Sequence, residues 1–275
     1  MTVLIIGGSG FLGAELVRQA VAAGYVTAAT FATRPGGAPG VAWHALDLCD
    51  PERVEAVVAE VGPRFVVNAT SGAADWAVTA EGPVRLAMAA ATYGFRLVHV
   101  SSDAVFSGAR VHYDEACLPD PVTPYGAAKA AAETGVRLVC PDAVVARTSL
   151  IIGDRRSAHV RAVHDLAAGV RDGALFTDDI RCPVHVADLA AALLELAASE
   201  ECGVRHLAGP EAVSRHELGT LIAGRDGLDA SRLPTGLRAE SGLPGALDVR
   251  LDSRATQRTL RTTLRGAREF LAPAF

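Results

Sequence analysis

Short runs of apolar residues alternate, along the first half of the chain, with longer segments of helical period. The apolar runs end at turn residues and occupy positions 3–6, 26–31, 41–46, 65–67, 97–100 and 143–146. Between them, helical segments are predicted over about 10–23, 50–62, 83–93 and 125–139. Strands separated by helices predict βαβ units, and hence an α/β fold with a doubly wound parallel sheet.

The alternation of predicted strands and helices becomes less regular after residue 147. Helices are predicted over 157–170, from 187 or 188 to 199, from Ser214 onward and over 264–271, and residues 225–245 are predicted to form loops. We therefore expect one large domain over residues 1–150 and a small C-terminal lobe over residues 151–275. The boundary between the two parts near residue 150 is not sharp, because the strand and helix of 184–199 could return to the main sheet.

Composition narrows the classes of partner. The chain has 275 residues, is 50% hydrophobic and carries a formal charge of −5, so neither nucleic acid nor an anionic membrane is an expected partner. The five cysteines are widely spaced, and no HExxH motif is present, which argues against a disulfide framework and against a metal site. The N-terminus lacks the basic residues of a signal peptide, and segment 188–199 is too short and polar to span a bilayer. A cytoplasmic setting is expected.

A glycine turn follows the first predicted strand directly. Gly7, Gly10 and Gly13 form a Gly-x-x-Gly-x-x-Gly pattern that opens the first helix, with Phe11 and Leu12 inside it. Such a turn lets backbone N–H groups and the helix N-terminus approach a pyrophosphate. Its position predicts that residues 1–150 form a Rossmann-type dinucleotide-binding domain. The C-terminal lobe then becomes the expected substrate-binding part.

The end of the second strand bears on the choice of dinucleotide. An NAD site usually has an acidic residue there, whereas this chain has Thr33 and Arg34, which could pair with a 2′-phosphate. NADP(H) is therefore preferred and NAD(H) stays open, with a solvated loop arginine as the alternative reading. Further expected cofactor contacts lie after the third and fourth strands, where either set could equally be turn or cap residues. They are Asp47, Leu48, Asn68, Ala69 and Thr70.

Three polar residues form a candidate catalytic set. Tyr125 and Lys129 lie four apart, on one face of a predicted helix, and Ser102 ends the fifth strand. A free tyrosine titrates near about 10, and the charges of Lys129 and an oxidised nicotinamide are expected to lower that pKa. Tyr125 would donate a proton to a carbonyl oxygen as hydride arrives, and Ser102 would orient that oxygen. Lys129 could also hold the nicotinamide ribose.

Together these motifs resemble the extended short-chain dehydrogenases/reductases, and more narrowly the dTDP-4-dehydrorhamnose reductase family of sugar-nucleotide reductases. The most specific segment is Ser-Asp-x-Val-Phe-x-Gly, residues 102–108. The other segments that carry the resemblance are 7–13, 30–35, 46–50, 113–115, Pro121, 124–129, Glu133, 147–149 and 251–253. The resemblance implies a Ser102/Tyr125/Lys129 triad, substrate contact by Asp103, and reduction of the 4-keto group of a dTDP-linked 6-deoxyhexose with NADPH or NADH.

Two positions depart from the family pattern and keep alternatives open. Ala104 stands where tyrosine is usual, and Leu150 stands where an aromatic residue is frequent, so polar and stacking surface around the substrate is lost. This favours, as a second hypothesis, a reductase of a smaller and more apolar ketone. A third hypothesis is a non-catalytic regulatory subunit, against which the intact triad argues. The sequence leaves open whether the chain forms a homodimer.

Overall fold

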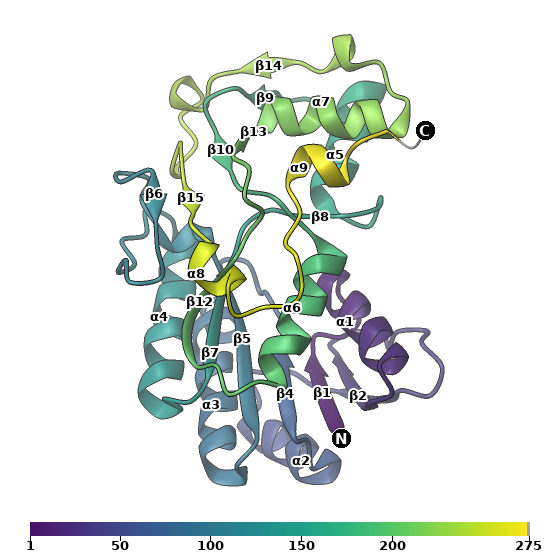
Figure 1. The fold of residues 1–275 in the computed structure, drawn as a ribbon, viewed down its shortest axis with the longest axis vertical. Coiled ribbons are helices and arrows are strands. Elements are labelled where there is room, and N and C mark those ends of the chain that lie inside the picture. Colours follow the sequence, from purple (N-terminus) through teal and green to yellow (C-terminus); the bar gives the residue numbers. More distant parts are fainter. Residues whose placement is uncertain (274–275) are drawn as a thin grey trace.

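The computed structural model describes residues 1–273 and contains a parallel sheet with helices on both faces (Figure 1). All seven strands of the sheet pair in parallel, in the order β12-β7-β5-β4-β1-β2-β3. The strands are β1 (Thr2–Ile6), β2 (Val26–Phe31), β3 (Ala42–Ala45), β4 (Phe65–Asn68), β5 (Arg96–Ser102), β7 (Val144–Thr148) and β12 (Gly203–Leu207). The predicted α/β, doubly wound class is confirmed.

The alternation of side chains in each strand divides the core between the two faces of the sheet. Val3 and Ile5 of β1 pack with helices α1 and α6, whereas Leu4 and Ile6 pack with α2, α3 and α4. This arrangement explains why the strands are apolar on both sides. The five helices are α1 (Phe11–Ala22), α2 (Pro51–Val61), α3 (Gly82–Tyr93), α4 (Pro124–Val139) and α6 (Val186–Ala197), and a π-helical turn, η1 (Ala77–Glu81), leads into α3.

Local signals in the sequence set the helix ends. Asp50 caps α2 by accepting from the Arg53 N–H at 3.0 Å, and Gly62 ends that helix in the left-handed conformation. Thr123 caps α4 in the same way, with its Oγ1 accepting from the Gly126 N–H at 3.1 Å. Pro124 stands at the first position of α4, where its missing N–H costs no hydrogen bond.

The second half of the chain contributes to both parts of the molecule. Strand β12, which the sequence pattern did not predict, adds to the main sheet beside β7, and α6 packs against α1 through a Gln19 Nε2 to Ala187 O hydrogen bond of 2.8 Å. The other elements form a smaller part beyond the carboxyl ends of the strands (Figure 1). Its helices are α5 (Ala158–Ala168), α7 (Arg215–Asp226), α8 (Arg254–Gln257), α9 (Ala267–Phe270) and the short turns η3 (Ala230–Arg232) and η4 (Arg238–Glu240).

Short strand pairs complete this smaller part. β10 (Ile180–Arg181) pairs antiparallel with β13 (Val213–Ser214), and the remaining pairs are parallel. They are β8 (Ile151–Ile152) with β11 (Val184–His185), β9 (Leu175–Phe176) with β14 (Thr235–Gly236), and β6 (His112–Tyr113) with β15 (Arg250–Leu251). Over residues 1–273, no helix combines the length and the apolar character that a bilayer crossing requires.

Candidate active site

A cavity of about 790 Å³ lies at the carboxyl ends of the strands, where the smaller part meets the sheet. Parallel α/β sheets bind their ligands at this edge. The glycine-turn side contributes Phe11, Leu12, Ala69, Thr70 and Ser71, and the centre contributes Ser102, Asp103, Ala104, Tyr125 and Lys129. The far side is formed by Ser149, Leu150, His159 and five arginines, at positions 156, 161, 181, 215 and 238.

The glycine turn has the shape of a phosphate cradle. Gly10 N–H donates to Gly7 O at 3.0 Å, and a Cβ on Gly13 would lie 2.0 Å from that same oxygen, so only glycine fits there. Gly7 has a φ of 79° and donates its N–H to Thr30 Oγ1 at 3.0 Å. No side chain caps the start of α1, so its first N–H groups are free for an anion. The turn fits the pyrophosphate of a dinucleotide.

The residues predicted to select the cofactor lie on exposed turns after β2 and β3. Thr33 and Arg34 are both exposed, and Arg34 forms no ion pair with any residue in the described part of the chain. Asp47 is exposed, and its carboxylate accepts from the Cys49 N–H at 2.9 Å. Leu48 is buried, and its side chain packs in the core between the sheet and helices α2 and α3.

The fourth strand ends in a closed hydrogen-bonded turn. Asn68 Oδ1 accepts from Thr70 N–H at 3.1 Å and from Thr70 Oγ1 at 2.6 Å, while Asn68 Nδ2 lies 3.2 Å from His99 Nδ1. Asn68 is fully buried, so its side chain shapes the turn. Ala69 and Thr70 line the cavity, as does Ser71, which the sequence analysis did not identify.

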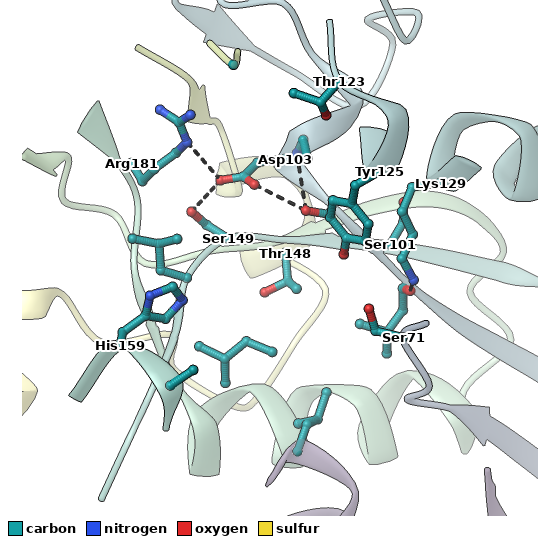
Figure 2. A pocket seen from close by; sticks show the side chains of 18 of the residues that line it. Ser71, Ser101, Asp103, Thr123, Tyr125, Lys129, Thr148, Ser149, His159 and Arg181 are labelled. Atoms are coloured by element: carbon teal, nitrogen blue, oxygen red, sulfur yellow. Dashed lines mark hydrogen bonds and ion pairs between the residues drawn. The ribbon is translucent and has the colours of Figure 1, made fainter. Parts of the chain in front are cut away.

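The fold brings Ser102 and Tyr125 together through a close approach of α4 to the end of β5. A Cβ on Gly126 would lie 2.1 Å from the Ala104 carbonyl oxygen, so glycine after Tyr125 is what allows the contact. Ser102 Oγ accepts from the Ala104 N–H at 3.1 Å and donates to Asp103 Oδ1 at 3.2 Å. Figure 2 shows Tyr125, Lys129 and Asp103 around one space.

The environment sets the protonation of Tyr125 and Lys129. Burial raises the pKa of Tyr125, and the Ser102 and Ser71 hydroxyls only partly oppose this shift. In the protein alone, burial of the phenol is thus the dominant effect, and the lowering expected from Lys129 together with an oxidised nicotinamide stays a prediction. Lys129 is itself buried, and its Nζ donates to Val100 O at 3.0 Å. Burial lowers the pKa of Lys129 to about 8, against the Glu133 carboxylate, which raises it.

The predicted substrate residues lie in different settings. Asp103 is buried and accepts from Ser149 Oγ at 2.6 Å, and Arg181 Nε lies 3.6 Å from the same carboxylate (Figure 2). Ala104 lines the cavity without offering a polar side chain. Leu150 also borders the cavity, but it is only 8% exposed and packs in the core of the smaller part.

The sequence analysis missed an arginine cluster at the far end of the cavity. Its centre is the buried Asp179, which binds Arg181 at 2.9 Å, Arg238 at 2.9 Å and Arg215 at 3.3 Å. Arg156 is paired with Asp154 at 2.9 Å, and Arg161 completes the five arginines that line this end. Within the described ion pairs, these five arginines meet three carboxylates, those of Asp103, Asp154 and Asp179.

His159 also lines the cavity and was missed. Arg215 Nη1 lies 3.4 Å from His159 Nδ1, and a guanidinium can only donate, so Nδ1 accepts and the proton of the neutral ring is on Nε2. Burial lowers the pKa of His159 to about 4, and Arg215 adds to this effect, so the ring is neutral at physiological pH. No single sequence motif holds His159 and the arginines, since they lie on α5, β10, α7 and η4 and on the segment before α5.

This fold and this set of side chains define an oxidoreductase of the extended short-chain dehydrogenase/reductase class. Within that class, the chain belongs to the family of sugar-nucleotide reductases whose model is described as RmlD substrate binding domain and matches residues 1–272. The resemblance inferred from the sequence is confirmed.

Named relatives agree with this assignment. The chain is 32% identical over 245 residues to the dTDP-4-dehydrorhamnose reductase of Mycobacterium tuberculosis. The aligned region covers 84% of this chain and 77% of the relative. A crystal structure of a hypothetical dTDP-4-dehydrorhamnose reductase from Sulfolobus tokodaii has a TM-score of 0.82 at 26% identity, covering 96% of this chain and 97% of that one. The Bacillus anthracis dTDP-4-dehydrorhamnose reductase, solved in complex with NADP, shares the fold with a TM-score of 0.83 at 22% identity, covering 98% and 96% of the two chains.

Proposed function

We propose that the protein is an NADPH-dependent reductase of the 4-keto group of a dTDP-linked 6-deoxysugar. The observation that carries this proposal is one cavity that holds Ser102, Tyr125 and Lys129 at its centre and an arginine excess at its far end. The central residues suit reduction of a carbonyl, and the arginines suit a polyanionic handle on the same substrate.

The charge of the far end favours a nucleotide-linked substrate over a small apolar ketone. The arginines outnumber the carboxylates that pair with them, which suits the negative charges of a sugar-linked diphosphate, whereas a neutral ketone would leave this excess uncompensated. Ala104 and Leu150 lower the polarity beside the reacting carbonyl, which favours a smaller and more apolar ketone as the second candidate. We rank the nucleotide sugar first because the arginines outweigh two apolar positions.

The choice of NADP(H) over NAD(H) rests on the exposed Arg34. Arg34 lies after β2 without an ion-pair partner among residues 1–273, where a 2′-phosphate would reach it. The Bacillus anthracis relative was solved with NADP. NAD(H) is the second candidate, since structures of the same fold, such as Bordetella bronchiseptica WbmG, were solved with NAD.

In the proposed mechanism, the chain itself handles the proton. A reduced nicotinamide, when bound, supplies the hydride that reaches the carbonyl carbon. A tyrosine is protonated at neutral pH, and burial raises the pKa of Tyr125 further, so its phenol can donate to the developing alkoxide. Ser102 Oγ orients the same oxygen when it turns from Asp103. Lys129 places a positive charge behind the phenol and stabilises the tyrosinate that remains.

The test is a turnover assay with NADPH and dTDP-4-dehydro-6-deoxysugars, followed by loss of NADPH absorbance. We expect turnover with the wild type and a loss of roughly a hundredfold or more in Tyr125→Phe, which keeps the ring and removes the proton. Tyr93→Phe, on the exposed end of α3, is the matched control and should keep wild-type activity. Turnover of simple ketones alone would favour the smaller substrate. NADPH binding without turnover of either would favour a regulatory subunit.

A further inference from the structure

A buried ion pair lies directly behind the catalytic side chains. Glu133 and Arg147 are 2% and 1% exposed, and they meet through Arg147 Nη2 at 2.8 Å and Nε at 3.0 Å from the carboxylate. Ser101 Oγ donates to the same carboxylate at 2.6 Å. Arg147 also donates to Cys117 O at 3.0 Å and stacks over Phe106 at 4.9 Å. The pair is thus satisfied on all sides, as a buried pair must be.

The members of this network stand on the elements that carry the proposed catalytic residues. Ser101 immediately precedes Ser102 on β5 and is the register partner of Arg147 on β7. Glu133 follows Lys129 by one helical turn on α4. The network therefore fixes α4 relative to both strands, at the level of the catalytic groups.

Lys129 is the only lysine of the chain, since every other basic side chain apart from histidine is an arginine. Its ammonium group is almost completely shielded from solvent, which lowers the pKa of Lys129, and the Glu133 carboxylate opposes that effect. On β5, burial lowers the pKa of His99 well below its usual range, and Lys129 lowers it further, so His99 adds no charge. Tyr125 on the same helix is neutral. Asp103, directly after β5, acts on the pKa of Tyr125.

We propose that Glu133 is a positioning residue for the reaction, which with Arg147 and Ser101 holds α4 in register and keeps Lys129 cationic. The role in turnover rests on the proposed function, whereas the charge of Lys129 can be measured without any substrate. The cation is present below the Lys129 pKa and is lost as the pH rises through it. Removing the Glu133 charge should move this loss to lower pH.

The direct experiment follows the Lys129 side chain by NMR in protein labelled with ¹³C-lysine, where a single lysine gives a single Cε signal. The wild-type signal should titrate near pH 8, and in Glu133→Gln the midpoint should fall by about one pH unit. Turnover should then be roughly fivefold lower at pH 8 and nearly normal at pH 6. Glu55→Gln, on the exposed side of α2, is the matched control and should leave the midpoint in place.

A second variant separates this role from a merely structural one. Replacing a buried ion pair by apolar residues of similar size often leaves stability unchanged, so Glu133→Leu/Arg147→Met should unfold at the wild-type denaturant concentration while its Lys129 midpoint stays lowered. A wild-type midpoint in Glu133→Gln or in the double variant would overturn the proposal. A lowered midpoint in a wild-type-like fold that never reduces a nucleotide sugar would instead overturn the proposed function alone.

Discussion

At the scale of single residues, Arg34 is the side chain on which the proposed preference for NADPH depends. It is exposed after β2, so Arg34→Ala should leave the fold intact. A charge-assisted contact to the 2′-phosphate would be lost, and we expect the KM for NADPH to rise roughly tenfold to a hundredfold while the KM for NADH stays the same. Steady-state kinetics with both dinucleotides measure this. Arg171→Ala, equally exposed after α5, is the control, and an unchanged NADPH/NADH ratio in Arg34→Ala would remove Arg34 from the site.

The predictable residues of the site are those held by local motifs. Tyr125 and Lys129 share a helix face, and the glycines of 7–13 follow a strand, so sequence spacing alone placed them. Arg181 and Arg238 could not be found this way, because only tertiary contacts bring them to Asp179. The protonation of Tyr125 also escaped prediction, since burial is a property of the assembled fold.

At the scale of elements, the approach of α4 to the end of β5 determines whether the proposed catalytic groups, Ser102 and Tyr125, meet. Gly126→Ala would place a methyl group 2.1 Å from the Ala104 carbonyl, so α4 or the turn after β5 must move. We expect a loss of kcat of at least roughly tenfold and a stability loss of about 1–3 kcal/mol. Both are measured by turnover and by urea unfolding.

The matched control for Gly126→Ala is Gly224→Ala on α7. A Cβ there meets no atom within 4 Å, so this variant should keep full activity and gain slight stability from helix propensity. Full activity in Gly126→Ala as well would show that the close approach of α4 does not matter for the reaction.

Most elements of the main sheet were predictable because their apolar runs end in turn residues. β12 was not, since Arg205 and His206 interrupt its apolar pattern. His206 is nevertheless fully buried, and the strand is held in place by its parallel pairing with β7. Its membership of the sheet is thus a result of long-range pairing, which local periodicity does not encode.

At the scale of the whole molecule, the second half of the chain lies over the carboxyl edge of the sheet (Figure 1) and supplies the far side of the cavity. The arginine cluster joins segments that are far apart in sequence, since Asp179 binds Arg181 beside it, Arg215 at the start of α7 and Arg238 in η4. Asp179 therefore joins the smaller part and the proposed anion-binding end of the cavity.

Asp179→Asn tests this double role. It leaves three largely buried guanidinium groups without their shared counter-ion, so the free energy of unfolding should fall by about 3–5 kcal/mol in urea titrations. An anion bound between the arginines would restore part of the loss. We therefore expect sulfate or dTDP-glucose to raise the Tm of Asp179→Asn more than that of the wild type.

Asp172→Asn, on an exposed turn after α5, is the control and should respond to both ligands as the wild type does. A Tm gain in Asp179→Asn no larger than this control would mean that the arginines serve the fold alone. A larger gain with dTDP-glucose than with sulfate at equal saturation would place the nucleotide, beyond its diphosphate, against the same end of the cavity. That outcome would join the stability of the smaller part to the binding of the proposed substrate.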